Sequence, residues 1–182
     1  MNTPGHTEIR VAGTGGQGLI LAAKMLAGAL AREGRALAQS QTYEPTSRGG
    51  YCNADLVVDD DAVDYPMATS LDVLVLLDRL AVEPSWDLLA PGALVIADTR
   101  LCPTVPERVP PGCRVVQAPL TRAAIDLGSE RVANIVALGA LSVLREVCDA
   151  DTLEAAVRAD TPAGFVELNL RALAEGRAIG KR

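Results

Sequence analysis

Six residues near the start of the chain have the spacing G-x-G-x-x-G, namely Gly13-Thr14-Gly15-Gly16-Gln17-Gly18. The alternating run Glu8 to Gly13 precedes them and an Ala- and Leu-rich stretch, Leu19 to Arg32, follows, which predicts a strand, a glycine turn and a helix. Glycines in such a turn let the backbone approach a ligand closely, and free N–H groups at a helix start attract an anion. These residue types therefore permit a phosphate site.

The surrounding residues do not favour a bound dinucleotide. The second predicted strand, Arg35 to Tyr43, ends with Gln39-Ser40-Gln41 and lacks the Asp or Glu that would hold a ribose hydroxyl. No Lys follows Gly18, as it would in a P-loop. The alternative is structural, since the same glycines can let the first helix pack tightly on the sheet or on a partner. We give this packing interpretation the greater weight.

A second glycine-rich segment, Ser47-Arg48-Gly49-Gly50, follows the second predicted strand. In an α/β sheet it would lie beside the first segment at the carboxyl ends of the strands, where ligands bind. Arg48 could hold a carboxylate or a phosphate through two hydrogen bonds, and Gly49 and Gly50 would admit another backbone. An exposed turn arginine is the alternative, equally weighted if the segment is taken alone.

The sequence gives little support for a metal site or for chemistry by histidine or cysteine side chains. Asp59-Asp60-Asp61 with Asp64 could attract Mg²⁺, but a charge run at a turn is usually only solvated. His6 is the single histidine, which argues against a His-based triad or a His-ligated metal. The four cysteines contain no C-x-x-C pair and are expected to be buried free thiols: Cys52, Cys102, Cys113 and Cys148. We predict no metal site in this chain.

Composition limits the classes of protein that remain. The chain has 182 residues, of which 49% are hydrophobic and 22% charged, so one ordered domain is expected. Aromatic residues are only 3%, the net charge is −6 and the pI is about 4.8, which disfavours nucleic acid as a partner. No signal-like start and no apolar run of spanning length is visible. We therefore expect a cytoplasmic protein that does not bind membranes.

Strands and helices are expected to alternate along the chain. The pattern predicts an α/β fold, a three-layer α/β/α sandwich with a mostly parallel sheet, a Rossmann-like start and a helical C-terminal third. The run Tyr51 to Asp59 follows the previous strand after a connection too short for a crossover helix, which indicates an antiparallel strand and a mixed sheet. We expect a flexible lead at 1–7, a single domain at 8–178 and a tail at 179–182. The predicted strands are 8–13, 35–43, 51–59, 71–77, 93–98 and 114–118, and the predicted helices 19–32, 84–89, 120–127, 132–147, 152–158 and 164–175.

Five ordered segments together resemble the gamma subunit, or gamma domain, of the 2-oxoacid:ferredoxin oxidoreductases. They are Gly13 to Gly18, Gln39 to Tyr43 with Ser47 to Gly50, Asp64-Tyr65-Pro66, Asn134 to Ala140, and Glu167 to Leu170. The common family loop Gly-Pro-Glu-Ala-Arg-Gly-Gly is replaced here by Glu44-Pro45-Thr46-Ser47-Arg48 and two glycines, so the arginine and the glycines are kept. The match extends from about Ile9 to Glu175.

The resemblance implies an enzyme complex that decarboxylates pyruvate, 2-oxoglutarate, 2-ketoisovalerate or indolepyruvate and releases an acyl-CoA. Thiamine diphosphate, Mg²⁺ and iron–sulfur clusters would belong to the alpha and beta subunits, and ferredoxin or another acceptor would take the electrons. This chain would be architectural, with no catalytic residue and no activity alone. The residues expected to face CoA, substrate or partner are Gly13, Gly15, Gly16, Gln17, Gly18, Ser47, Arg48, Gly49 and Gly50. A free-standing dinucleotide-binding reductase and a ligand-binding regulatory domain are the alternatives.

Overall fold

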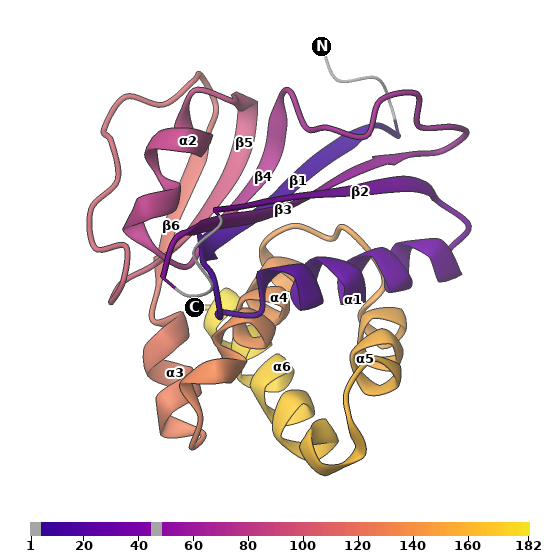
Figure 1. The fold of residues 1–182 in the computed structure, drawn as a ribbon, viewed down its shortest axis with the longest axis vertical. Coiled ribbons are helices and arrows are strands. Elements are labelled where there is room, and N and C mark those ends of the chain that lie inside the picture. The colour runs from indigo at the N-terminus through magenta and orange to yellow at the C-terminus, as the bar shows by residue number, and fades with distance from the viewer. Residues whose placement is uncertain (1–4, 45–48) are drawn as a thin grey trace.

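A computed structural model describes residues 5–44 and 49–182 of the chain (Figure 1). Six strands form one sheet in the order β2-β3-β1-β4-β5-β6. The strands are β1 (Thr7–Thr14), β2 (Ala36–Tyr43), β3 (Tyr51–Asp59), β4 (Leu71–Leu76), β5 (Leu89–Asp98) and β6 (Arg114–Ala118). The α-helices are α1 (Leu19–Arg32), α2 (Glu83–Trp86), α3 (Leu120–Asp126), α4 (Ala133–Leu144), α5 (Ala150–Ala159) and α6 (Val166–Gly180), and the 3₁₀ turns are η1 (Arg79–Ala81), η2 (Glu130–Val132) and η3 (Ala163–Phe165).

The sheet is mixed, as the short connection before Tyr51 predicts. Strands β1, β4, β5 and β6 are parallel to one another, whereas β3 is antiparallel to both β1 and β2. In the register, Cys52 of β3 is paired with Gly13 on one side and with Tyr43 on the other. The beginning of β3 therefore lies at the sheet edge where β1 and β2 end.

Helices cover both faces of the sheet, which confirms the three-layer α/β/α prediction. Helices α1 and α3 to α6 form a thick layer on one face, and α2 with η1 lies on the other (Figure 1). Strand β1 serves both cores because Ile9 and Val11 point to the thick layer while Ala12 points to the thin one. None of the helices among the described residues is long and apolar enough to cross a membrane.

The thick layer depends on backbone contact between α4 and α6. A Cβ atom built on Gly139 would lie 2.9 Å from both Arg177 N and Gly176 Cα, and one built on Gly176 would lie 2.9 Å from Ala140 N. Real Cβ atoms do not approach other atoms this closely, so glycine is required on both helices at the crossing. The two helices pack closer together than side chains would allow.

A buried ion pair lies on the thin side of the sheet. Arg10 of β1 donates from Nε and Nη2 to the two carboxylate oxygens of Asp55 on β3, each at 2.7 Å. Arg10 also donates to Pro84 O at 3.2 Å, which links the sheet to α2. Burial alone would lower the pKa of Arg10, but the hydrogen bonds and charge of Asp55 outweigh it and raise that pKa. The Arg10 guanidinium therefore stays charged, and its bond to Pro84 O holds α2 on the sheet.

Several element boundaries differ from the sequence prediction. Strand β5 begins at Leu89, so Pro91-Gly92 is an exposed irregularity within a strand and not a turn. The helix predicted for 84–89 is replaced by η1 and the short α2. Tertiary contacts cause this, because Leu71 N donates to Leu88 O and Gly92 N donates to Pro111 O. Thr7, counted above with the lead, is paired with Val58 as the first residue of β1. Helix α6 continues to Gly180.

The described chain start is tied to the end of β3 by His6. Its Nδ1 lies 3.0 Å from Asp59 Oδ2 and its Nε2 lies 3.3 Å from Glu8 Oε1. The hydrogen bond with Asp59 is the main reason that the pKa of His6 is raised, with partial burial opposing it and Glu8 adding to it. The sequence gives no motif for this contact, since its two ends are far apart in the chain.

Candidate functional site

The side chain of Gln17 holds the first glycine segment in a closed turn. Its Oε1 accepts a hydrogen bond from Thr14 N at 2.7 Å, and its Nε2 donates to Leu77 O, just beyond the end of β4, at 3.0 Å. A Cβ atom on Gly13 would collide with Gln17 Oε1 and lie 3.3 Å from Leu77 Cβ. Gly13 is therefore needed so that Gln17 can fold back and join the ends of β1 and β4.

The second glycine segment lies directly against the first. Gly15 N donates to Gly50 O at 2.9 Å, and Gly49 N donates to Gly15 O at 3.4 Å. The sequence places both segments at one sheet edge, and these hydrogen bonds bring Gly15, Gly49 and Gly50 into contact. Ser47 and Arg48 lie outside the described residues.

Helix α4 holds the end of the first segment, where α1 begins. Asn134, almost fully buried, donates from Nδ2 to Gly18 O at 2.8 Å. Gly18 has φ +75°, and a Cβ atom there would lie 2.5 Å from Asn134 Nδ2, so both backbone geometry and space require glycine. Gly16 has φ +101° and open space above it. The turn is thus fixed at Gly13, Gln17 and Gly18 and open at Gly16.

A buried carboxylate organises the neighbouring strand end. Asp98, the last residue of β5 and 0% exposed, accepts hydrogen bonds at Oδ2 from Arg100 N at 3.1 Å and Leu101 N at 2.8 Å. Its Oδ1 accepts from Thr121 N at 2.7 Å, at the beginning of α3. One side chain thereby positions both the turn after β5 and the first residues of α3.

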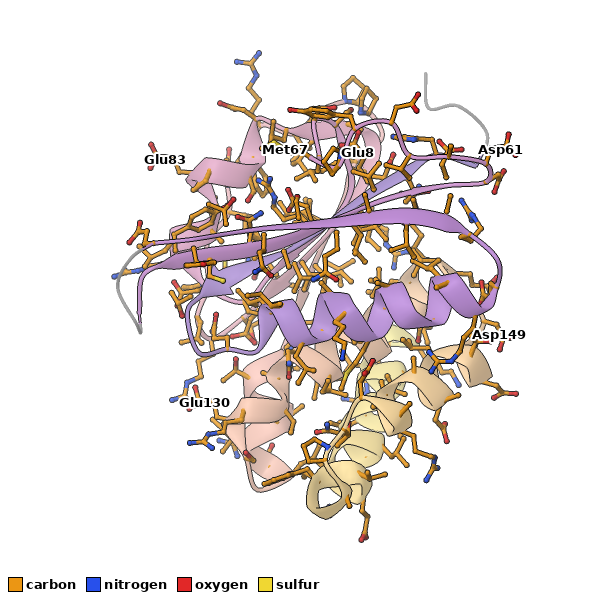
Figure 2. The ribbon with its side chains drawn as sticks, turned by 45° about the vertical axis from the view of Figure 1, so that its right-hand side comes forward. Glu8, Asp61, Met67, Glu83, Glu130 and Asp149 are labelled. Carbon is orange, nitrogen blue, oxygen red and sulfur yellow. The ribbon has the colours of Figure 1, made fainter. Side chains whose placement is uncertain are left out.

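A cavity of about 210 Å³ lies between these elements. Gly16 and Gln17 of the first segment form one wall, Leu101 and Thr121 a second, and residues 130–133 at the start of α4 the third. Figure 2 shows Glu130 close to the turn between β1 and α1, on the outer side of the molecule. The turns that follow β1 and β5 therefore border one small hollow at the carboxyl edge of the sheet, the position at which α/β sheets bind ligands.

The polar groups of this cavity are mostly hydrogen-bond donors. Thr121 is 1% exposed, and its Oγ1 has no hydrogen-bond partner among the described residues. Arg131 is exposed and makes no ion pair or side-chain hydrogen bond within the described part of the chain. The N-cap residue of α4, Val132, makes no side-chain cap, but Asn134 Oδ1 accepts a hydrogen bond from Ile135 N at 2.9 Å in the first turn. Glu130 supplies the single carboxylate of the lining.

Sequence reasoning identifies the glycine segments but misses the opposite wall. Thr121 and Arg131 lie more than a hundred positions beyond Gly16 in the chain and belong to no recognisable motif. Asp98 carries a weak signal, since an acidic residue that ends a buried apolar strand must find partners. The unpaired hydroxyl of Thr121 becomes visible only once the chain is folded.

The cysteines offer no nucleophile at this edge. Burial, with the nearby charges of Asp78 and Asp98, raises the pKa of Cys102 to about 11. Burial, together with Glu33 and Asp149, raises the pKa of Cys148 to about 12. All four cysteines are free, and Cys113 is the one that is partly exposed. Three or more His, Cys, Asp or Glu residues do not gather as a metal site anywhere in the described ranges.

A larger hollow lies elsewhere on the molecule. It measures about 850 Å³ and separates α2 from the Pro-rich segment 106–111, with Trp86 and Arg108 among its walls. Two of its lining residues are joined by a hydrogen bond, since Trp86 Nε1 donates to Arg108 O at 2.8 Å. This groove shares no residue with the glycine segments, so the smaller cavity remains the candidate site.

Comparison with known proteins identifies relatives over nearly the whole chain. Residues 8–179 match the pyruvate ferredoxin/flavodoxin oxidoreductase family. The 2-oxoglutarate synthase subunit KorC of Methanocaldococcus jannaschii is 34% identical over 177 residues, which cover 96% of this chain and 94% of that one.

Two solved structures share the fold and cover almost all of the chain. The gamma subunit of a keto/oxoacid ferredoxin oxidoreductase from Geobacter sulfurreducens has a TM-score of 0.83 at 34% identity, covering 96% of this chain and 98% of that one. The 2-oxoglutarate:ferredoxin oxidoreductase of Magnetococcus marinus, with 2-oxoglutarate, coenzyme A and succinyl-CoA bound, has a TM-score of 0.85 at 28% identity. There the match covers 97% of this chain but 31% of the other, so the corresponding domain is part of a longer polypeptide.

Proposed function

The chain belongs to the pyruvate ferredoxin/flavodoxin oxidoreductase family, and we propose that it is the gamma-type subunit of a 2-oxoacid:ferredoxin oxidoreductase complex. Such a complex oxidatively decarboxylates a 2-oxoacid with CoA to an acyl-CoA and CO₂ and passes two electrons to ferredoxin. The observation that carries the proposal is the end-to-end match with separate subunits of this kind, 94% of the M. jannaschii chain and 98% of the G. sulfurreducens chain.

The redox cofactors of the complex belong to its alpha and beta subunits in this proposal. The described residues do not fit an iron–sulfur cluster, because Cys52 and Cys148 lie in the core on one face of the sheet while Cys102 and Cys113 pack on the other. No acidic or histidine cluster among them fits Mg²⁺ with thiamine diphosphate. The chain's own contribution is therefore structural and ligand-facing.

The paired glycine segments are the part of the chain that we assign to the partner subunits and to the CoA path. Their contact through Gly15, Gly49 and Gly50 forms one bare backbone surface that another chain can approach closely. Exposed apolar side chains flank it: Ile20 and Leu21 are 36% and 38% exposed in the first turn of α1, and Tyr43, at the end of β2, is 64% exposed. Such groups are typical of a surface that is covered in an assembly.

We also propose that the complex is cytoplasmic, with ferredoxin or another soluble carrier as its acceptor. Three of the four free cysteines are buried and reduced, as is usual in a reducing compartment. The M. jannaschii relative named above is a subunit of 2-oxoglutarate synthase, so 2-oxoglutarate is the first 2-oxoacid to assay.

Co-expression tests this function. The chain is produced with a tag, alone and together with the alpha and beta subunits encoded in the same genome, and purified by the tag and by size exclusion. We expect the larger subunits to co-purify as a brown complex that forms acyl-CoA from a 2-oxoacid, CoA and oxidised ferredoxin. The chain alone should be colourless and inactive. Elution as a separate monomer in the presence of the partners, or 2-oxoacid oxidation by the chain alone, would overturn the proposal.

A further inference from the structure

Strand β2 ends the sheet and leaves one of its backbone edges unpaired. It lies alongside α1, is eight residues long and follows β3 in an unbroken register from Ala36 to Tyr43 (Figure 1). Proteins usually protect such an edge with a charge, a proline, a bulge or a short strand, because exposed N–H and C=O groups recruit other strands. The sequence of β2 contains no charged residue and no proline, and its register has no bulge. This edge is therefore open to another strand.

The opposite edge of the same sheet is protected. Strand β6 has five residues, begins at Arg114 and is followed directly by Pro119. The side chain of Gln117 also donates from Nε2 to Pro103 O at 3.0 Å, so a neighbouring segment contacts this strand. One sheet thus has one shielded edge and one unshielded edge, and the unshielded edge is the longer one.

The hydrogen bonds to β3 show which backbone groups of β2 face outward. Glu44 N donates to Tyr51 O at 3.1 Å, and in an antiparallel pair such bonded positions alternate, so the even-numbered residues of β2 bond to β3. The N–H and C=O groups of the odd-numbered residues point away from the sheet. In the described ranges these groups make no backbone hydrogen bond outside the strand ladder. The outward-facing residues are Leu37, Gln39, Gln41 and Tyr43.

We propose that β2 pairs with β2 of a second copy of this chain, antiparallel about a two-fold axis, so that the two sheets become one. The axis keeps equal faces together, so each residue lies opposite one of the same odd or even number. The register centred on Ser40 places all the outward-facing residues in hydrogen-bonded pairs, Leu37 with Tyr43 and Gln39 with Gln41. A register centred on Gln39 leaves Tyr43 without a partner inside the strand.

The side chains that the Ser40-centred register brings together are complementary. Leu37 packs against the core on the α1 side, and Tyr43, on the same face and 64% exposed, covers the Leu37 of the other copy. Gln39 and Gln41 are both exposed, and their amides exchange hydrogen bonds across the two strands. The chain has a net charge of −6 but no charge on β2, so two copies meet at a neutral strip. A strand that matches itself in this way favours a second copy as the occupant.

The proposed contact adjoins the surface assigned above to partner subunits and does not replace it. The two surfaces meet at Tyr43, where β2 ends beside the glycine segments. Pairing through β2 uses only residues 36–43 of this chain, so it does not rest on the proposed function. A complex that contains the chain then holds two copies of it.

Sedimentation of the isolated full chain at low and high micromolar concentrations measures the pairing. We expect a dimer of twice 19.0 kDa. Gln39→Lys combined with Gln41→Lys places lysine opposite lysine and should weaken the dimer at least about tenfold. Gln39→Lys combined with Gln41→Glu is the matched variant, because it places lysine opposite glutamate and should associate about as tightly as the unaltered chain. The chain is acidic, so two added lysines lower its overall charge, and weaker association then comes from the local contact.

A cysteine cross-link tests the register. In the proposed dimer Ser40 lies opposite Ser40 of the second copy in a non-hydrogen-bonded pair, with Cα atoms about 4.5 Å apart. This separation suits a disulfide. Ser40→Cys should therefore form a covalent dimer under mild oxidation, seen on a non-reducing gel. Thr42→Cys is the control, because it lies opposite Ala38 and away from its own copy, and it should cross-link little.

The proposal is overturned if the chain stays monomeric at high micromolar concentration, if the two double variants associate equally, or if Ser40→Cys cross-links no more than Thr42→Cys. Circular dichroism confirms that each variant is folded. A monomeric chain whose lysine double variant no longer co-purifies with the alpha and beta subunits would assign the edge to a partner strand and would also overturn the proposal. Co-purification of the unaltered chain is measured separately, so a dimer that never joins the complex would contradict the proposed function alone.

Discussion

Replacing Gly176 by alanine tests the closest contact in the fold. The added Cβ atom would lie 2.9 Å from Ala140 N and from Gly139 Cα, and closer still to Val136 O. All three atoms belong to the backbone of α4, so no side chain can rotate to make room. Helix α4 would have to move away from α6 by about an ångström to relieve the contact with Val136 O, and this displacement would loosen a helix in which ten residues are buried.

The expected loss follows from two opposing effects. Overpacking a well-filled core costs about 1–3 kcal/mol, and here the upper end applies because the clash is with backbone. Alanine recovers about 1 kcal/mol of helix propensity relative to glycine. The net loss of unfolding free energy is therefore about 2 kcal/mol. For a chain of this length that corresponds to a fall in Tm of roughly 4–8 °C.

Thermal and urea unfolding of the purified chain, followed by circular dichroism, measure this loss. Gly164→Ala is the control, because nothing lies within 4 Å of a Cβ atom there and its φ is not positive. It should leave Tm within about 2 °C, since substitutions at such open positions usually change stability by less than about 0.5 kcal/mol. If Gly176→Ala has the same Tm as Gly164→Ala, the two helices do not touch through their backbones and the reasoning is refuted.

Three further outcomes are expected. In native protein at pH 8, iodoacetamide should alkylate Cys113 first and leave Cys102 unmodified, because burial raises the pKa of Cys102 to about 11; mass spectrometry of the digested protein checks this order. The pKa of His6 is raised in the folded state, so the stabilisation by His6 is complete below the unfolded pKa of about 6.5 and is lost as the pH rises through the folded value. In urea unfolding, the loss of unfolding free energy caused by His6→Asn should therefore shrink toward alkaline pH. A loss that is constant with pH would contradict this expectation. Arg48→Ala should loosen the assembled complex or raise the KM for CoA or the 2-oxoacid, with a binding free-energy loss of about 2–5 kcal/mol if the guanidinium is buried against an anion. Arg158→Ala removes an exposed side chain that pairs with Glu154 of its own helix and should do neither, so identical behaviour of the two variants would make Arg48 a surface residue.

Local patterns were sufficient for most of the fold. The span Leu19–Arg32 is a helix because its Ala and Leu spacing, its leading glycine and its trailing Gly34 all agree. The antiparallel direction of Tyr51–Asp59 follows from the short connection before it. The start of β5 could not be predicted, because Pro91-Gly92 has the local signature of a turn and only the pairing of Leu89 with Leu71 keeps it in the sheet.

The candidate site was predictable on one side only. Gly13, Gln17 and Gly18 stand in a recognisable motif, so their place at the sheet edge follows from the sequence. Thr121 and Arg131 reach the same cavity through the arrangement of α3 and α4, which depends on packing across the whole layer. The role of Asn134 is of the same kind, because its contact with Gly18 joins two helices that are distant in the chain.

The antiparallel course of β3 divides this sheet edge into a fixed part and an adjustable part. The Gly13–Gly18 turn cannot change length, because Gln17 spans from β1 to β4. In the described part of the connection between β2 and β3, Glu44 N donates to Tyr51 O at 3.1 Å and closes the two strands upon each other, and Gly49 and Gly50 are hydrogen-bonded to Gly15. Insertions between these two contacts would leave every strand in register. We expect natural variants of this subunit to differ in the length of that connection and to keep the same Gly13–Gly18 turn beside it.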